Sequence, residues 1–375
     1  LLAVGRIPVR SVAQGELFVD KLQAYETAPP ARWPKRMLLL AGGTSEGEQN
    51  QLQFYSDRWG EIASDTVANV DGDPVPVHTG ADTLQYYKKV NDALDASFQD
   101  SLAVDLQEGT GWLNYFGHSA AQTWEIVTDP PAEWQNAGRL PIAISLGCRT
   151  GSFAGGRFEQ KSAPSLGEQI VVGSVRPDGT PRDGALNGGI AHFGESALGN
   201  LIPSARINDA LVERVFVDTM RVLGTAIQEA KAEINDDFGN SDFYVKHLLQ
   251  YGLLGDPATN IALPTRPDFH VAPSLISTTP ATPVPSDELT VEVRLQNRGL
   301  IPRDSVTARL TWHRPDGTVA RRTRRLDRFR LEKPLSFSFD LDERALGPNT
   351  FRVRVDPDNA YNEPNETDNT AEQTQ

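Results

Sequence analysis

The sequence predicts an α/β domain with a mostly parallel sheet and helices on both faces, followed by an all-β sandwich. In residues 1–264, short continuous apolar runs alternate with helix-compatible stretches, as in sheets that are buried on both faces. From residue 286 to residue 375, apolar and polar residues alternate with a period of two, as in antiparallel strands with one buried face. A chain of 375 residues is long enough for one medium domain and one small domain.

Four apolar runs are the expected strands of the first domain. They are RMLLLA (36–41), GWLNYFGH (111–118), LPIAISLGC (140–148) and GGIAHF (188–193). The polar stretch 83–106 fits a helix. Residues 207–223 also fit a helix, because their apolar side chains recur at helical spacing on one face. Strands that alternate with helices in this way favour a parallel sheet.

The amino-acid composition of the chain changes after Pro264. Residues 265–285 are rich in Pro, Ser and Thr, which favours a linker or an extended strand that leads into the next domain. Leu289, Val291, Val293 and Leu295 then alternate with polar residues, and turns such as PDG (315–317) separate further runs of this kind. We expect an immunoglobulin-like sandwich over 286–375 without chemistry of its own, because it contains no paired carboxylates or histidine cluster.

Composition excludes several classes of function. The net charge of −14 argues against a nucleic-acid partner, because phosphate binding needs a basic face. No apolar stretch approaches the roughly 20 residues of a membrane span. A single cysteine excludes an internal disulfide and a cysteine-type zinc site. The histidines show no metal-ligand spacing, so we expect neither a catalytic metal nor an organic cofactor.

Cys148 and His118 end two of the predicted strands. The carboxyl ends of neighbouring parallel strands open onto one crevice, where a thiol and an imidazole can meet. This pair is the skeleton of a cysteine hydrolase. The alternative is structural, because a lone cysteine is usually a small buried apolar residue and a lone histidine a packed or surface residue.

Five blocks of the sequence resemble the gingipain-type cysteine peptidases, which belong to the caspase-like group. In order, they are VGRIPVRSVAQGELFVDKLQAYE (4–26), NYFGHSAAQTW (114–124), SLGCRTGSF (145–153), SLGEQIV (165–171) and YGLLGDPA (251–258). The end of the chain (355–371) resembles the close of a CARDB-type immunoglobulin-like domain, a module common on bacterial surface proteins. The resemblance implies a caspase-like peptidase domain over 1–264 that lacks an upstream portion present in relatives.

The resemblance also implies roles for site residues. Cys148 matches the nucleophile that forms a thioester, and His118 matches the residue that transfers protons. The backbone amides of Ser119 and Cys148 match the oxyanion hole. Trp124, six positions after the histidine, is expected to wall the substrate cleft, with core packing as the alternative.

The chain departs from the family pattern at two places. Ser119 replaces the usual glycine after the histidine, so a side chain is expected to intrude beside the cleft. Glu46 and Glu48 are the candidates for the acid that orients the histidine, and an exposed loop is the alternative for both. Relatives that cleave after Arg or Lys carry a buried acid where this chain has residues 50–52 (NQL), so we do not expect that specificity.

The expected function is a cysteine endopeptidase with a Cys148–His118 dyad. Two alternatives remain open, a sortase-like transpeptidase with the same dyad and a catalytically silent surface or scaffold protein. The substrate would be a protein or peptide. The sandwich would anchor the chain at a surface or dock a protein partner through an edge strand. We expect secretion or a cell-surface location.

Acidic residues near the end of the chain raise the question of structural calcium. A solvated acidic turn is the alternative, because the spacing fits no EF-hand loop. The residues concerned are Asp356, Asp358, Asn359, Glu363, Glu366 and Asp368.

Overall fold

The computed structural model describes residues 2–64, 66–68, 74–76, 79–89, 96–153, 163–173, 186–280 and 288–374. The chain divides into two compact units, the first made mainly of residues up to 263 and the second mainly of residues from 264 on.

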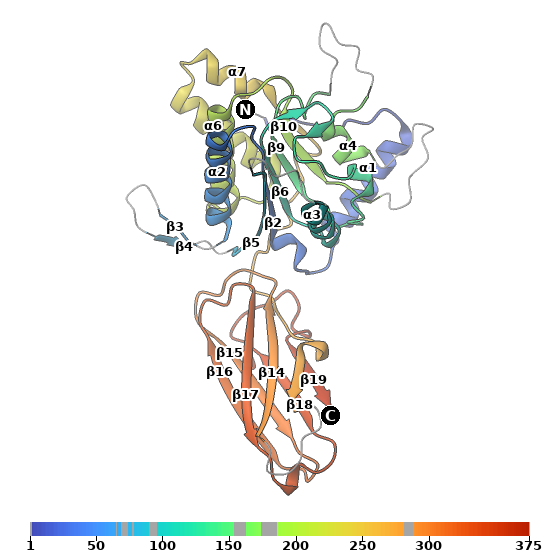
Figure 1. The fold of residues 1–375 in the computed structure, drawn as a ribbon, viewed down its shortest axis with the longest axis vertical. Helices are drawn as coiled ribbons and strands as arrows, with labels where there is room; N and C mark the ends of the chain where they lie inside the picture. The colour runs from blue at the N-terminus through green and yellow to red at the C-terminus, as the bar shows by residue number, and fades with distance from the viewer. Residues whose placement is uncertain are drawn as a thin grey trace. The chain divides into compact units, whose positions relative to one another are not determined.

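The first unit is built on a seven-stranded sheet with the order β1-β11-β10-β9-β6-β2-β5 (Figure 1). From β10 to β5 every neighbouring pair is parallel, while β11 runs antiparallel to β10. This confirms the predicted mostly parallel sheet. The strands are β1 (Gly5–Arg6), β2 (Arg36–Ala41), β5 (Asp82–Tyr87), β6 (Trp112–Phe116), β9 (Ile142–Leu146), β10 (Ala191–Glu195) and β11 (Tyr251–Leu254).

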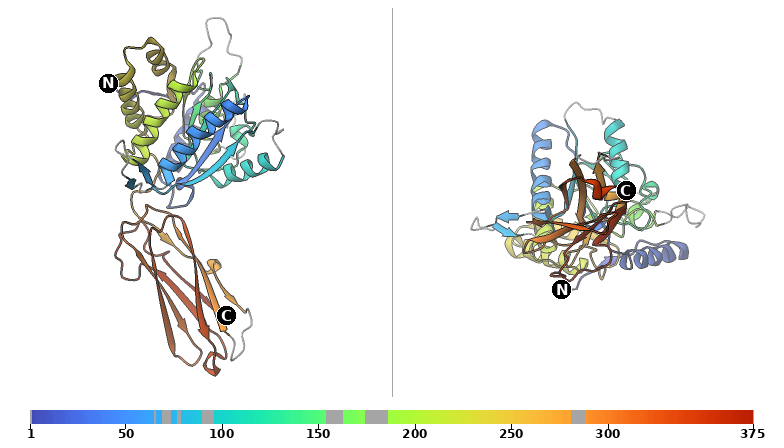
Figure 2. Two further views of the ribbon diagram at one scale, coloured as in Figure 1. Left: turned by 60° about the vertical axis from the view of Figure 1, so that its left-hand side comes forward. Right: turned by 90° about the horizontal axis from the view of Figure 1, so that it is seen from below.

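Helices cover both faces of this sheet (Figures 1 and 2). Successive residues of β2 serve the two faces in turn. Leu39 packs in one apolar cluster with Trp59 of α2, and Leu40 packs in another with Leu102 of α3. The helices are α1 (Val12–Glu26), α2 (Glu46–Ser64), α3 (Ala96–Glu108), α4 (Leu166–Val172), α5 (Leu201–Val212), α6 (Leu223–Phe238) and α7 (Asp242–Gln250).

The structure corrects the helix predicted over 83–106. Residues Asp82–Tyr87 form β5, and the helix in this region is α3, Ala96–Glu108. All six residues of β5 pair with β2, so tertiary pairing outweighs the weak local preference of a polar stretch. Residues 90–95 lie outside the described part of the chain.

The helix predicted over 207–223 is interrupted. Helix α5 ends at Val212 and runs into a π-helical turn, Glu213–Val217, and α6 begins only at Leu223. Between them Thr219 adopts a positive φ of 58°, which no helix accommodates. The apolar spacing crosses this break because Val215 and Leu223 are both buried in the same core.

The second unit is a β-sandwich, as predicted. In one sheet β14 pairs with β12, β13 and β17, and the other has the order β16-β15-β18-β19. Alternate residues of β14, from Leu289 to Leu295, are buried between the sheets. The strands are β12 (Phe269–His270), β13 (Ile276–Thr279), β14 (Glu288–Asn297), β15 (Val306–His313), β16 (Val319–Leu326), β17 (Glu332–Asp340), β18 (Thr350–Val355) and β19 (Thr370–Thr374).

Part of the segment 265–285 belongs to this sandwich. Strands β12 and β13 both pair with β14, so this part of the segment is strand as well as connection. Residues 281–285 lie outside the described part of the chain. Short elements complete the chain: strands β3 (Thr66–Ala68), β4 (Pro74–Pro76), β7 (Ser119–Ala120) and β8 (Thr123–Trp124), and 3-10 turns η1 (Trp33–Lys35), η2 (Pro131–Glu133), η4 (Pro273–Leu275) and η5 (Glu343–Ala345).

The acidic turn near the end of the chain is held by backbone amides. The two carboxylate oxygens of Asp356 accept the N–H groups of Ala360 and Tyr361 at 3.0 and 2.9 Å. Within the residues that the structure describes, no three or more His, Cys, Asp or Glu side chains are grouped so as to hold a metal ion. In the same part of the chain, none of the helices has the length and apolar composition of a membrane span.

Candidate active site

Strand register brings His118 and Cys148 to the same edge of the sheet. Strands β6 and β9 are parallel, and their last paired residues are Phe116 and Leu146. The chain continues in step beyond them, because Gly117 N–H donates to the Leu146 carbonyl at 3.3 Å. Each candidate residue therefore lies two positions beyond the end of its strand. Both line one cavity of about 100 Å³.

Cys148 is half-buried and begins a tight turn. Gly199 N–H donates to its Sγ at 3.4 Å. The turn itself is fixed by Thr150, whose hydroxyl lies 2.8 Å from Ser145 Oγ and 3.2 Å from the Gly147 carbonyl. The sulfur is thus presented at the cavity by a rigid turn and faces a backbone donor.

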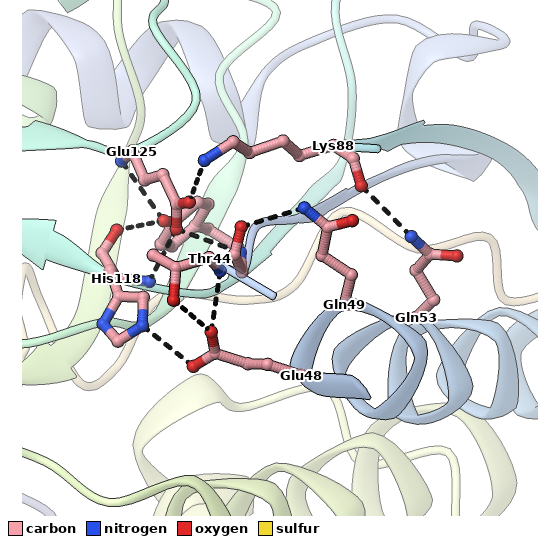
Figure 3. A network of polar contacts seen from close by, with 9 residues as sticks. Thr44, Glu48, Gln49, Gln53, Lys88, His118 and Glu125 are labelled. Atoms are coloured by element: carbon pink, nitrogen blue, oxygen red, sulfur yellow. Dashed lines mark hydrogen bonds and ion pairs between the residues drawn. The ribbon is translucent and has the colours of Figure 1, made fainter. Parts of the chain in front are cut away.

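His118 is paired with an acid on α2. Its Nε2 lies 2.8 Å from Glu48 Oε1, and Thr44 holds the other oxygen of Glu48 through its N–H and hydroxyl, at 2.7 and 2.9 Å (Figure 3). Burial opposes ionisation of Glu48, but the Thr44 donors and His118 outweigh it and lower the pKa of this carboxyl. With Nε2 so engaged, Nδ1 is the ring nitrogen that remains for proton transfer.

The two candidate acids have different surroundings. Glu48 lines the cavity beside His118. Glu46 is exposed at the first position of the same helix and is not among the residues of the cavity wall. The arrangement therefore brings together His118 and Glu48 and leaves Glu46 in solvent.

A second acid, Glu125, secures the backbone of His118 and was missed in the sequence. Its Oε2 accepts the N–H groups of Gly43 at 3.0 Å and of His118 at 3.2 Å. Lys88 forms an ion pair with the other oxygen (Figure 3). The Tyr115 hydroxyl donates to the His118 carbonyl. Nothing in the residue pattern distinguishes Glu125 from a solvated loop carboxylate.

Ser119 connects the two strand tips. Its hydroxyl donates to the Cys148 carbonyl at 2.8 Å. A Cβ atom at Gly147 would lie only 2.6 Å from Ser119 Oγ, so the side chain fills the space that this glycine leaves. The expected intrusion beside the cleft is therefore corrected, because the serine side chain turns toward the Cys148 turn.

Trp124 is a core residue. Its side chain is 2% exposed, its Nε1 donates to Ser145 Oγ at 2.9 Å, and its ring stacks on Tyr115 with centroids 4.9 Å apart. It is not among the residues that line the cavity. The expectation that Trp124 walls the cleft is corrected to a packing role, because the buried ring contacts Tyr115 of β6 and Ser145 of β9.

Glu195, at the end of β10, also lines the cavity and was missed in the sequence. The Ser204 hydroxyl lies 3.1 Å from its Oε1, and burial raises the pKa of this carboxyl to about 7. Of the residues at 50–52, Leu52 lines the cavity and contributes an apolar wall. A carboxyl nevertheless reaches the cavity from another strand.

Comparisons with known families identify both parts of the chain. The model of peptidase family C25 matches residues 1–262, and the CARDB model matches residues 266–373. A search of curated protein sequences gives no match.

Two solved structures resemble the chain over almost its whole length. The Arg-specific cysteine proteinase gingipain R (RgpB) is 15% identical, with a TM-score of 0.52 over 99% of this chain and 74% of that chain. The complex of the RgpB pro- and mature domains of Porphyromonas gingivalis is 15% identical, with a TM-score of 0.51 over 100% and 76%. At this identity the likeness shows the fold. Together with the family match it confirms the predicted resemblance: the chain belongs to peptidase family C25.

Proposed function

We propose that the chain is a cysteine endopeptidase in which Cys148 is the nucleophile and His118 transfers the protons. One observation supports this most directly. Cys148 and His118 follow the paired ends of two neighbouring strands and line the same cavity, and Glu48 contacts Nε2 of the imidazole. Membership of a peptidase family supports protein or peptide substrates.

The proposed reaction has two halves. His118 accepts the thiol proton as the Cys148 sulfur bonds to the carbonyl carbon of the scissile peptide, and the carbonyl oxygen takes up negative charge. Backbone amides of Ser119 and Cys148 would stabilise that charge. The C–N bond then breaks, the departing amine takes the proton from His118, and a thioester remains. Water hydrolyses the thioester and returns the proton to sulfur. No cofactor enters either half.

The acid–imidazole contact has a defined part in this scheme. Glu48 accepts a hydrogen bond from Nε2–H of His118 and so holds the imidazole in the tautomer whose Nδ1 is a base. Its carboxylate also stabilises the imidazolium formed after proton uptake. Glu125 fixes the backbone from which that ring projects.

The cavity is the proposed pocket for the substrate residue before the cleaved bond. Leu52, Phe116 and Leu146 give it apolar walls, and Glu195 and Ser204 lie in it as polar groups. The expectation that Arg and Lys are disfavoured depended on the residues at 50–52 alone. Because Glu195 adds a carboxyl to the same cavity, a peptide library should first vary the charge of the substrate residue before the cleaved bond.

A peptide library tests the proposal. We expect the wild-type chain to cleave a subset of peptides and Cys148→Ala to cleave none.

A labelled amine added to the reaction separates the alternatives, because a transpeptidase joins the amine to the peptide, whereas an endopeptidase releases a peptide with a free carboxylic acid. A thiol-directed inhibitor that carries a peptide carbonyl should label Cys148 faster than a free thiol. If Cys148 is labelled no faster than a free thiol, and His118→Ala does not change the labelling rate, the chain is a catalytically silent protein on this fold.

The sandwich has a proposed role in placing the enzyme. We propose that it anchors the chain at a surface or docks a protein partner along its edge strands β16 or β19, and that the protein is secreted or held at the cell surface. Fractionation of cells that produce the chain tests its location. Fractionation of cells that produce an unrelated reporter, either alone or fused to the sandwich, tests anchoring.

A further inference from the structure

The loop after β10 contacts the nucleophile directly. Gly199 N–H donates to Cys148 Sγ at 3.4 Å. A hydrogen bond to sulfur favours the thiolate over the thiol, since the acceptor gains negative charge. The position of one backbone amide therefore bears on the reactivity of the cysteine.

The carboxyl of Glu195 lies against this glycine. A Cβ atom at Gly199 would lie 1.7 Å from Glu195 Oε2, so the carboxyl occupies the space of the absent side chain. Gly199 does not have a positive φ, so its backbone conformation is open to other residues. The demand for glycine here comes from the carboxyl and not from the backbone.

Other contacts keep the carboxyl and the loop in place. Ser204 Oγ lies 3.1 Å from Glu195 Oε1 and 2.7 Å from the Asn200 carbonyl. The loop is tied to the nucleophile turn by two backbone bonds, from Arg149 N–H to the Ala197 carbonyl at 2.9 Å and from Gly151 N–H to the Glu195 carbonyl at 2.8 Å. The turn at Cys148 and the loop at Gly199 thus form one assembly with the carboxyl between them.

The serine hydroxyl links this assembly to the protonation of Glu195. A hydroxyl donates one hydrogen at a time. When Glu195 is protonated, it can donate to Ser204 Oγ, and Ser204 can donate to the Asn200 carbonyl. When Glu195 is ionised, both acceptors compete for the same hydrogen, and the carboxylate also places negative charge near the sulfur.

The charged and titratable groups around Glu195 come from several elements. Lys246 of α7 acts on it through its charge, the Tyr251 hydroxyl of β11 lies beside it, and Cys148 shares its cavity. Burial is the largest influence and raises the pKa of Glu195 to about 7. The carboxyl therefore exchanges its proton in the neutral range.

We propose that Glu195 is a positioning residue for the nucleophile: its carboxyl packs against Gly199 and holds the Gly199 N–H on Cys148 Sγ. This rests on the proposed function only in taking Cys148 as the nucleophile. The shape of the carboxyl holds the donor, while its negative charge opposes the thiolate. A neutral group of the same shape should therefore serve at least as well.

Alkylation of the single cysteine by iodoacetamide, followed by intact mass, measures this without turnover. At about pH 7 we expect Glu195→Ala and Gly199→Ala each to slow alkylation about 10-fold. We expect Glu195→Gln to match or exceed the wild-type rate. In the Glu195→Ala background, Gly199→Ala should slow alkylation by less than about 3-fold, because its methyl group then has room. Gly15→Ala, whose Cβ would meet nothing within 4 Å, is the matched control.

Two results would overturn the proposal. One is an equal cost of Gly199→Ala in both backgrounds, and the other is Glu195→Gln as slow as Glu195→Ala. Circular dichroism and thermal unfolding of each variant exclude misfolding as the cause of slow alkylation. Peptide cleavage is measured in parallel. A wild-type chain that shows the alkylation pattern but cleaves no peptide contradicts the proposed function alone, and cleavage without the pattern contradicts this inference alone.

Discussion

His118 Nε2 lies 2.8 Å from Glu48 Oε1, and this contact joins the tip of β6 to the first turn of α2. The acid is itself held by two donors from Thr44, so the ring is oriented by a short chain of contacts (Figure 3). Because one nitrogen donates to Glu48, the tautomer with a basic Nδ1 is favoured. Two neighbouring acids on one helix should therefore differ sharply in their effect on catalysis.

Glu48→Gln should lower kcat about 10- to 100-fold with little change in KM, since it removes the charge that stabilises the imidazolium. Steady-state kinetics on the best library peptide measures this. Glu46→Gln is the matched control and should leave kcat within about 2-fold, because Glu46 is exposed at the start of the same helix. Equal losses in the two variants would contradict the assignment.

Glu125→Gln should impair both stability and activity. One oxygen of the Glu125 carboxylate accepts from both Gly43 and His118, and the other pairs with Lys88. The amide of Gln keeps one oxygen, which is a weaker acceptor without the charge, and turns an NH2 group toward the Lys88 ammonium. We expect a loss of about 1–2 kcal/mol in the free energy of unfolding and about 10-fold in kcat/KM. Lys88→Gln should cost less on both measures, since the two amide contacts persist. A larger effect of Lys88→Gln would show that the ion pair contributes more to stability and activity than the hydrogen bonds from Gly43 and His118 to Glu125.

The strand tips could be predicted from the sequence because their signal is local. An apolar run sets each strand, and His118 and Cys148 stand at its end. Glu48 lay among the predicted acids for the same reason, since it follows β2 by a short loop. Glu125 and Glu195 could not be found in this way. Glu125 acts through a contact with Gly43, which is far away in the sequence. Glu195 contacts Ser204 and Gly199 of the loop that follows it, and the sequence does not reveal that this loop folds back onto the carboxyl. A strand-end carboxylate has no distinguishing pattern.

The two helix predictions failed for a related reason. Periodicity records which side chains are buried, not whether the backbone between them is continuous. Val215 and Leu223 face one core from either side of a break, so their spacing looked helical. Strand β5 has little apolar pattern of its own and is fixed by its pairing with β2.

Calcium removal should leave the sandwich intact. Both oxygens of Asp356 are occupied by the N–H groups of Ala360 and Tyr361, so the turn is closed without an ion. We expect a chelator to shift Tm by less than about 1 °C, and Asp356→Ala to lower the free energy of unfolding by about 1–2 kcal/mol. Differential scanning calorimetry with and without chelator checks both. A chelator shift as large as that of the substitution would reveal a bound ion.

Glu195 should make the folded state less stable as pH rises toward neutrality. Its folded pKa is about 7 and its ordinary value is 4.5, so between these values the folded state holds more protons than the unfolded state. Stability contributed by this group is full below about pH 4.5 and is lost as pH rises through 7. As pH rises across this window, the free energy of unfolding of Glu195→Gln, measured with urea, should increase by up to about 3 kcal/mol relative to that of the wild type. A difference that does not change with pH would mean that Glu195 titrates normally.

Lys21 should act in the opposite direction and in a more alkaline window. It is fully buried in α1 and donates to the carbonyls of Ile170 and Val171, at 3.1 and 2.9 Å, at the end of α4. Helix α4 supports the nucleophile turn, because Gly167 N–H donates to the Thr150 carbonyl at 2.9 Å. Burial lowers the pKa of Lys21 to about 7 from an ordinary 10.5, so between these values the unfolded state holds more protons than the folded state.

The stability contributed by Lys21 should therefore grow as pH rises from 7 toward 10.5. We expect the wild type to gain on Lys21→Met by about 1 kcal/mol for each pH unit, in addition to the cost of leaving two carbonyls without a donor. Urea unfolding at several pH values measures the difference. Lys333→Met, at an exposed position on β17, is the control and should show no such slope. A flat difference for Lys21→Met would mean that the amine stays charged in the core and is stabilised by the α4 carbonyls alone.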